Sequence, residues 1–305
     1  MTAAGKRIAA NRGQTPISGS DPDLPETLGL IAGNGRFPLL LATEARRLGL
    51  HLVAVAHRGE TDEALAAQVD AITWIRVGQL GAMIRAFQQA GVRRAVMAGG
   101  VNKIRSLTQL RPDLRGLKFL RRAIAAGSRG DDALLRALAT ELEGEGIEVV
   151  SSTMFLDSLI ATPGRIAGPK PSAQGLADLR LGCQVLASLG GVDVGQSVVV
   201  ECGVVLAVEA IEGTDEAVRR GGKLGSGAAV VVKTSKQGQD LRFDVPAVGP
   251  ATIATMSEAG ACLLAVEAGV TLLLDRAQLV RAADHARIAV LGCSRSGAVA
   301  GFRDD

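Results

Sequence analysis

Between residues 28 and about 150, short apolar runs alternate with helix-like segments, and this alternation constrains the fold more than any other feature. Residues 28–32 and 50–57 are near-continuous apolar runs that indicate strands. A helix that begins near Phe37 and Pro38 separates them, and Gly49 suits its C-terminal end. Strands that alternate with helices form a parallel sheet with helices on both faces. The pattern therefore predicts a Rossmann-like parallel α/β domain.

The second half of the chain reads as a different α/β domain with a mixed sheet. Two strands over 196–213 turn at Cys202 and Gly203, and a short helix follows. Further on, we predict one helix over 250–269 and a strand over 270–275. The segment 161–174 is rich in proline and glycine, which favours a boundary. The predicted organisation is a disordered tail over 1–27, a first α/β domain over 28–160, a linker over 161–174 and a second α/β domain over 175–295.

Composition excludes several classes of function. Aromatic residues make up only 2% of the chain, which argues against a protein that stacks single-stranded nucleic acid. The net charge of +3 gives no polyanion-binding signal, but it is compatible with an anionic ligand or membrane surface. Four scattered cysteines without a C-x-x-C pair argue against zinc and disulfides and favour a reducing cytosol. No apolar run reaches the about 18 residues of a transmembrane helix.

The turn Gly33-Asn34-Gly35 links the first strand to the first helix. Such a turn brings backbone N–H groups to an anion at a helix N-terminus, although a tight turn needing positive φ is the plainer explanation. Pro38 occupies the place of the third glycine of a dinucleotide fingerprint, and His57 ends the second strand where an acid would hold a ribose. The turn therefore predicts a mononucleotide or diphosphate ligand and argues against NAD.

A second strand ends in Gly99 and Gly100, with Lys103 just beyond. Paired glycines alone are more often a simple turn. The carboxyl ends of parallel strands share one edge of a sheet, however, so both glycine turns are expected to lie together. Lys103 would then supply a point charge to a phosphate.

Carboxylates gather in two places. Asp131 and Asp132 stand at a predicted helix start, where they either cap the helix or bind a sugar hydroxyl or Mg²⁺. Glu209, Glu212, Asp215 and Glu216 fall within eight residues, where a strand becomes a helix. Thr214 with the acids beside it can serve as a helix cap, but the density of carboxylates favours a hard-cation site.

Charges of both signs also follow the predicted strand over 227–236. Lys233, Lys236, Asp240, Arg242 and Asp244 form either a solvated edge or a site for metal and phosphate. Lys170 in the linker adds a positive charge that is expected to face the gap between the domains.

Six motifs, in this order along residues 28–291, resemble one family. They are LGLIAGNGRFP, AGGVNK, GDDALLR, GPKPS, VVLAVEAIEGTDEA and QDLRFDVPAVG. As a set they are similar to the UDP-2,3-diacylglucosamine pyrophosphatases of lipid A biosynthesis, of the type found mainly in alphaproteobacteria. The resemblance implies UDP on the first domain, the diacylated sugar on the second, and the ligand between them. It also implies hydrolysis to UMP and 2,3-diacylglucosamine 1-phosphate with Mg²⁺, or with Mn²⁺ in its place.

The resemblance identifies Asp215 as the catalytic or metal-binding acid. We take Asp215, Glu212 and Asp244 as candidate catalytic carboxylates, and Asp215, Asp240 and Asp244 as candidate metal ligands. The candidate substrate-binding residues are Gly33, Asn34, Gly35, Phe37, Pro38, Gly99, Gly100, Val101, Lys103, Asp131, Asp132, Lys170, Thr214, Lys233, Gln239 and Arg242.

A lipid-linked nucleotide sugar implies transient contact with the inner face of the inner membrane. We expect a cytoplasmic, peripheral protein that acts as a homodimer and binds no nucleic acid. The basic residues Arg115, Lys118, Arg121 and Arg122 share a helix face and are the candidate contact, although a solvated helix face would look the same. Two alternatives stay open: a non-catalytic nucleotide-sugar or lipid-binding protein, and an enzyme acting on another nucleotide sugar.

Overall fold

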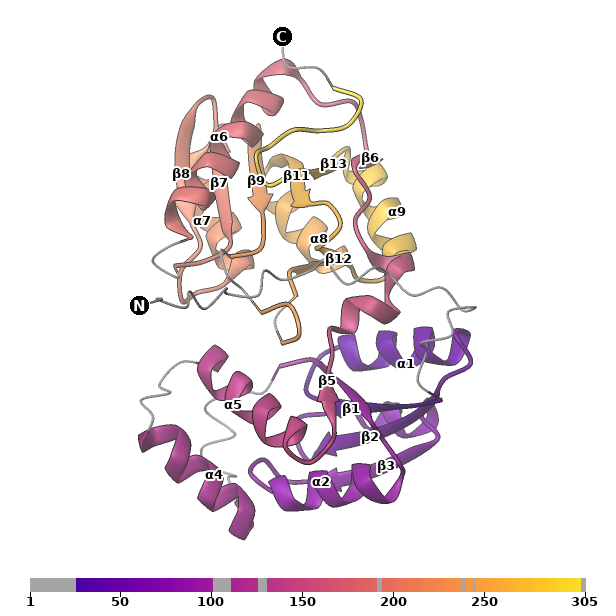
Figure 1. Ribbon diagram of the computed structural model, residues 1–305. Coiled ribbons are helices and arrows are strands. Elements are labelled where there is room, and N and C mark those ends of the chain that lie inside the picture. The colour runs from indigo at the N-terminus through magenta and orange to yellow at the C-terminus, as the bar shows by residue number, and fades with distance from the viewer. Residues whose placement is uncertain are drawn as a thin grey trace, which may run out of the picture.

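The chain forms two α/β domains, one above the other in Figure 1. The computed structural model describes residues 26–100, 111–125, 131–190, 194–236, 240–243 and 245–302, without the side chains of Asp131 and Asp132. No helix in these ranges is long and apolar enough to cross a membrane. The tail predicted over 1–27 lies almost wholly outside them.

The N-terminal domain is built on a five-stranded parallel sheet with the order β3-β2-β1-β4-β5. This confirms the predicted parallel sheet. The strand order reverses between β1 and β4, and ligands of open α/β sheets bind at such a reversal. The strands are β1 (Thr27–Ala32), β2 (His51–His57), β3 (Ala71–Ile75), β4 (Arg94–Ala98) and β5 (Glu148–Val149).

Helices cover both faces of this sheet because successive strand residues point to opposite sides. Leu28 and Leu30 of β1 face α1, whereas Ile31 faces α2 and α5, and each face has its own aliphatic core. The helices are α1 (Phe37–Arg47), α2 (Leu80–Gln89), α4 (Leu114–Ala125) and α5 (Asp131–Glu143). Short 3-10 turns lie at η1 (Glu63–Ala67), η2 (Ser152–Phe155) and η3 (Asp157–Leu159).

The C-terminal domain carries a six-stranded sheet with the order β6-β13-β11-β9-β7-β8. Strands β9, β11 and β13 are mutually parallel, and the remaining pairs are antiparallel, as a mixed sheet requires. The predicted mixed sheet is therefore confirmed. The strands are β6 (Gly164–Ala167), β7 (Ser197–Glu201), β8 (Val204–Val208), β9 (Ala229–Lys233), β11 (Ala261–Glu267) and β13 (Ala289–Cys293).

Helix α6 (Ala173–Leu189) covers one face of this sheet. Helices α7 (Thr214–Leu224), α8 (Pro250–Glu258) and α9 (Arg276–Ala286) cover the other. Two short parallel strands, β10 (Ala247–Val248) and β12 (Leu272–Leu273), form a separate sheet that packs against the N-terminal core. The two domains therefore share apolar contacts.

The prediction of one helix over 250–269 is wrong. The helix ends at Glu258, and β11, a central strand, occupies Ala261–Glu267. Gly260 lies between them with φ of +69°, a left-handed conformation that ends helices and that glycine adopts without strain. Of the strand predicted over 270–275, only Leu272–Leu273 forms. The predicted linker contains the edge strand β6, and α6 was not predicted.

The carboxyl-terminal edges of the two sheets face each other. Strands β8, β9, β11 and β13 run in the same direction, so their ends share one edge. Arg36, which follows β1, pairs with Asp275 across the domains at 3.1 Å. Segment 240–243, which follows β9, contacts α5 and Ser151 of the N-terminal domain. Residues that follow the strands of both domains are thereby brought near one another.

Candidate functional site

The two glycine turns of the N-terminal domain touch each other. The N–H of Gly33 donates to the carbonyl of Ala98 at 2.8 Å, and that of Asn34 donates to the carbonyl of Gly100 at 2.7 Å. A Cβ on Gly33 would lie 2.2 Å from the carbonyl oxygen of Gly100, so only glycine fits there. The structure thus brings Gly33, Asn34, Gly99 and Gly100 together, as expected for neighbouring strand ends.

This contact changes how the first turn can meet an anion. The N–H groups of Gly33 and Asn34 are already used within the protein. Gly35 has φ of +81° with open space where a side chain would be, and α1 begins without a side-chain cap. The amides that face a ligand are therefore those at the start of α1. Pro38, at the position of the missing third glycine, is buried in the first turn of that helix, and Phe37 beside it is half-buried.

Polar side chains secure this turn from the β2 side. The Asn34 amide donates to Glu60 at 3.0 Å. The buried His57 ring lies 2.9 Å from the Ala32 carbonyl through Nδ1, and the Thr61 hydroxyl donates to the same oxygen at 2.7 Å. Burial lowers the pKa of His57, which keeps the ring neutral. The neutral His57 ring thus stabilises the turn through its contact with the Ala32 carbonyl.

The C-terminal domain has a buried polar cluster at the edge where β8 and β9 end. The Thr214 hydroxyl donates to Glu209 at 3.1 Å and accepts from Lys233 Nζ at 3.0 Å. Glu209 also accepts from the N–H of Gln196 at 3.3 Å, and Ser197 Oγ lies 3.3 Å from the Thr214 hydroxyl. Glu209 and Lys233 are 8% and 7% exposed. One threonine therefore joins a buried carboxylate to a buried ammonium group.

Asp215 follows Thr214 in the first turn of α7 and is exposed. Within the described part of the chain, no hydrogen bond or ion pair engages its carboxylate. Gly213, with φ of +85°, precedes the helix and supplies no side-chain cap. A free carboxylate thus stands beside the uncapped amides of α7 and the Thr214–Lys233 pair.

Glu212 is less available than Asp215. Its carboxylate pairs with Arg220 at 2.7 Å, and Arg220 also donates to the carbonyl of Val208. Backbone hydrogen bonding at Glu212 itself, followed by the Arg220 guanidinium, lowers the pKa of Glu212. Its geometry is that of an ionised partner that holds the loop before α7.

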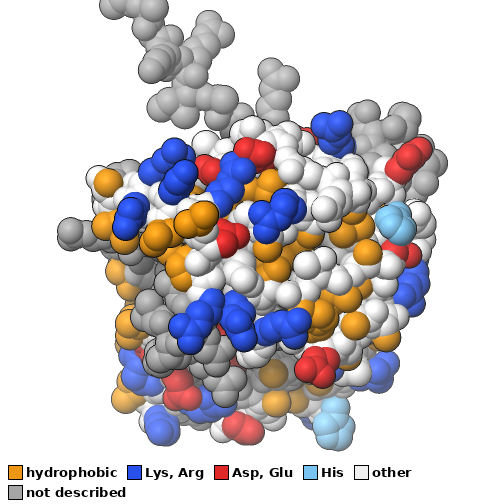
Figure 2. All heavy atoms as spheres, turned by 90° about the horizontal axis from the view of Figure 1, so that it is seen from below, with side chains coloured by type: hydrophobic (Ala, Val, Ile, Leu, Met, Phe, Trp, Pro, Cys, Tyr) orange, Lys and Arg blue, Asp and Glu red, His pale blue; other side chains and the backbone are white. Residues whose placement is uncertain are grey.

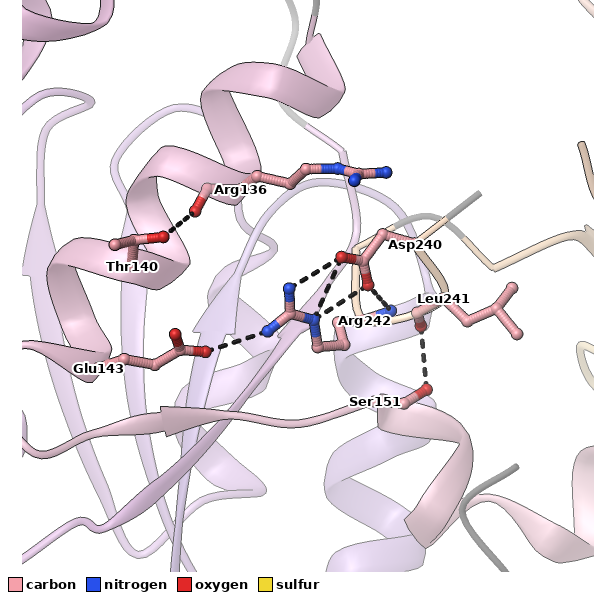
Figure 3. A network of polar contacts seen from close by, with 7 residues as sticks. All are labelled: Arg136, Thr140, Glu143, Ser151, Asp240, Leu241 and Arg242. Atoms are coloured by element: carbon pink, nitrogen blue, oxygen red, sulfur yellow. Dashed lines mark hydrogen bonds and ion pairs between the residues drawn. The ribbon is translucent and has the colours of Figure 1, made fainter. Parts of the chain in front are cut away.

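Asp240 and Arg242 form a strap between the domains (Figure 3). Arg242 donates to both oxygens of Asp240, at 3.0 and 2.8 Å, and to Glu143 of α5 at 3.0 Å. The Arg242 guanidinium also lies 4.9 Å from the Phe243 ring. Burial opposes ionisation of Asp240, but hydrogen bonds from the Arg242 side chain and backbone outweigh it and lower the pKa of Asp240.

Ser151 completes the strap by donating to the Leu241 carbonyl at 2.9 Å. In Figure 3, Arg136 of α5 extends alongside Asp240, and its charge adds to the lowering of the pKa. Both carboxylate oxygens of Asp240 are thus occupied by Arg242, and Arg242 holds carboxylates of both domains. In this arrangement the pair serves to join the domains.

Several predicted site residues lie outside the described residues. These are Val101, Lys103, Gln239 and Asp244, together with the side chains of Asp131 and Asp132. Lys170 is exposed in the segment between β6 and α6. Among the described residues, no three His, Cys, Asp or Glu side chains come together as a metal site.

The structure also adds two residues to the candidate site that were not predicted from the sequence. Ser197 is opposite Lys233 in the β7–β9 pairing, which brings its hydroxyl to Thr214. Glu143 meets Arg242 across 99 positions of sequence. Neither carries a local signal, because both depend on which elements pack together.

Comparison with known proteins shows the family of the chain. The LpxI N-terminal domain model matches residues 27–159, and the LpxI C-terminal domain model matches residues 162–291. A curated relative from Caulobacter vibrioides (strain ATCC 19089 / CIP 103742 / CB 15), "UDP-2,3-diacylglucosamine pyrophosphatase LpxI", is 35% identical over 273 residues. That alignment covers 87% of this chain and 96% of the relative.

Two of the solved structures that match are distant in sequence. A biotin carboxylase domain of a thermophilic 2-oxoglutarate carboxylase, bound to ADP, has 12% identity and a TM-score of 0.24 over 56% of this chain and 34% of that one. An L-amino acid ligase from Bacillus licheniformis has 14% identity and a TM-score of 0.24 over 64% and 41%. These scores support no inference. The two family models, which together span both domains, and the relative show that this chain belongs to the LpxI family.

Proposed function

We propose that this protein hydrolyses the pyrophosphate bond of UDP-2,3-diacylglucosamine and releases UMP and 2,3-diacylglucosamine 1-phosphate. The observation that carries the assignment is the family match across both domains, with 35% identity to a pyrophosphatase of that name. The family resemblance noted from the motifs points the same way. A nucleotide sugar with two acyl chains also suits two facing domains, one for each end of the molecule.

The carboxyl-terminal sheet edges are the proposed site. The nucleotide end would lie over the touching glycine turns and the uncapped start of α1. The sugar phosphate would lie against the start of α7, where Lys233 and Thr214 sit beside Asp215. A lysine and helix amides stabilise negative charge that develops on phosphate oxygens. Arg242 and Asp240 would keep the domains in register across this site.

In the reaction, a water oxygen bonds to the phosphorus next to the sugar, and the bond from that phosphorus to the bridging oxygen breaks. The bridging oxygen leaves with UMP. We assign Asp215 to orient the water and accept its proton, because its carboxylate is exposed and unengaged within the described residues. The Lys233 ammonium group would balance charge on the phosphates.

The proposal includes Mg²⁺, with Mn²⁺ as a substitute. The described residues supply no three-ligand protein site. Mg²⁺, however, commonly binds one or two carboxylates together with substrate phosphates. One oxygen of the exposed Asp215 carboxylate could bind such an ion while the other faces the water, whereas Arg242 holds both oxygens of Asp240. A bound Mg²⁺ would supply neutralisation of diphosphate charge. Asp244, outside the described residues, stays a predicted ligand.

The substrate's acyl chains place the proposed reaction at the cytoplasmic face of the inner membrane. We propose that the protein associates peripherally with this membrane. None of the described helices spans a bilayer. We also propose that the protein works as a homodimer. The net charge of +3 favours modest attraction to an anionic leaflet.

Product analysis tests the assignment. Purified protein should convert UDP-2,3-diacylglucosamine in detergent to UMP in the presence of Mg²⁺, and Asp215→Asn should abolish this. Glu216→Gln, a change in the same helix turn, is the matched control and should retain activity. Binding of the substrate without turnover by the wild type would favour a non-catalytic carrier. Turnover of another nucleotide sugar alone would favour the other alternative.

A further inference from the structure

Three of the four large aliphatic side chains of helix α4 point outward, whereas Leu120 is half-buried and Phe119 packs against the core of the N-terminal domain. The buried residues of α4 are the small Gly116 and Ala123, which lie seven positions apart on one face. Leu114, Leu117 and Ile124 are 82%, 40% and 74% exposed. A helix that packs on a core usually buries its large apolar residues. Among the described residues, no other element covers the outward face of α4, which leaves an exposed apolar surface.

The inner face of α4 is firmly anchored. The Asp113 carboxylate accepts from the N–H of Gly116 at 2.8 Å and from the N–H of Ala82 in α2 at 3.1 Å, so it caps both helices. A Cβ on Gly116 would lie 1.9 Å from the Gly78 carbonyl oxygen. Arg115 pairs with Glu141 at 3.0 Å and with Glu145. Turning the aliphatic face inward would require breaking these contacts.

Positive charge adjoins the outward aliphatic residues. Lys118, Arg121 and Arg122 are exposed on α4. An open depression of about 370 Å³ beside them is lined by Leu114, Arg115, Lys118, Arg122 and Glu141. Figure 2 shows the side of the molecule that is seen from below, where Lys and Arg side chains lie among hydrophobic ones.

These contacts change which of the four basic residues of α4 are available to contact a membrane. Arg115 is committed to Glu141 and Glu145, which raises its pKa, chiefly through the hydrogen bond to Glu145. Arg122 lies 3.8 Å from Glu141 but stays 75% exposed. The cations that can reach a surface are thus Lys118, Arg121 and Arg122, and three aliphatic side chains stand among them.

We infer that the outward face of α4 docks on the surface of an anionic bilayer. The aliphatic side chains would enter the boundary between headgroups and acyl chains, and Lys118, Arg121 and Arg122 would contact lipid phosphates. This inference rests on the proposed function in one respect: a substrate with two acyl chains must be collected from a membrane. The charge and exposure of the face are independent of it.

The test is flotation with phosphatidylethanolamine vesicles, with and without phosphatidylglycerol, at low and high salt. Wild-type protein should float with the anionic vesicles and lose part of that binding in high salt. Replacing Leu114, Leu117 and Ile124 by serine should reduce binding about tenfold or more. Replacing Lys118, Arg121 and Arg122 by glutamine should abolish the preference for phosphatidylglycerol.

The matched control replaces Val204, Val205 and Leu224 by serine. These are aliphatic residues of similar exposure, 58%, 38% and 65%, on the C-terminal domain. This variant should bind vesicles as the wild type does. Equal loss in both serine variants, or unchanged binding in the α4 variant, would overturn the inference.

Two further measurements separate the possible failures. All variants should turn over detergent-dispersed substrate at the wild-type rate, and only the α4 variants should slow on vesicle-embedded substrate. If the wild-type protein does not turn over the substrate in detergent, the proposed function is refuted. The flotation result would still decide whether α4 binds the bilayer. An α4 variant that changes from dimer to monomer in sedimentation, with vesicle binding intact, would reassign the face to a subunit interface.

Discussion

The buried Glu209 carboxylate should stabilise the C-terminal domain more than any exposed acid near it. It accepts hydrogen bonds from the Thr214 hydroxyl at 3.1 Å and from the N–H of Gln196 at 3.3 Å. Hydrogen bonds to charged groups contribute about 1.5–3 kcal/mol each, and the longer one should lie near the low end. The contributions of the two hydrogen bonds are not additive, so Glu209→Ala should lower the free energy of unfolding by about 3 kcal/mol. Glu209→Gln keeps one acceptor oxygen and should cost about 1 kcal/mol.

Urea denaturation followed by far-ultraviolet circular dichroism measures this loss. Trp74 is the chain's single tryptophan and lies in β3, so its fluorescence follows the N-terminal domain separately. Glu212→Ala is the control, because its pair with Arg220 lies at the surface and its removal should lower the free energy of unfolding only slightly. The Glu209→Ala variant should also lose turnover, since Thr214 directly precedes Asp215. A Glu209→Ala midpoint equal to that of Glu212→Ala would refute the reasoning.

Three further outcomes follow from the site. Activity should disappear on treatment with EDTA and return with Mg²⁺ or Mn²⁺, whereas full activity after exhaustive chelation would count against a hard-cation role for Asp215. Asp240→Asn should destabilise the protein at neutral pH. Because the folded-state pKa of Asp240 is lowered, this difference should vanish as pH falls through it, which urea titrations at several pH values would detect. Gly33→Ala should cost about 3 kcal/mol, since its Cβ would meet the Gly100 carbonyl oxygen at 2.2 Å. Gly100→Ala, with its nearest contact at 3.3 Å, should be mild, and equal melting temperatures would contradict the steric argument.

The N-terminal sheet could be predicted because its signals are local. Apolar strands such as 28–32, glycine stops such as Gly49 and the intervening helices each leave a mark within a few residues. The C-terminal sheet was harder, because only Ala259 and Gly260 separate α8 from β11, whose residues are nearly all apolar and buried. Burial on both faces removes the alternation that distinguishes a strand from a buried helix.

The candidate site was predictable in its residue types but not in its pairings. Asp215 could be selected from the cluster of acids and the family motif, and Lys233 from the run of charges that follows a predicted strand. Arg242 occupies both oxygens of Asp240 and also reaches Glu143. These contacts depend on how the two domains pack, so the sequence does not reveal them. The same dependence hides the role of Thr214, whose hydroxyl joins side chains from β9 and the end of β8.

In the proposed site, the contact between the two glycine turns would limit how this protein selects its nucleotide. Gly33 and Gly100 meet through main-chain atoms, and Gly33 leaves no room for a side chain. A surface made of peptide groups offers the same donors and acceptors whatever base lies above it. Selection among bases must therefore come from side chains carried by neighbouring segments. Those segments can vary in sequence while the underlying surface stays fixed, which separates the evolution of base preference from that of diphosphate binding.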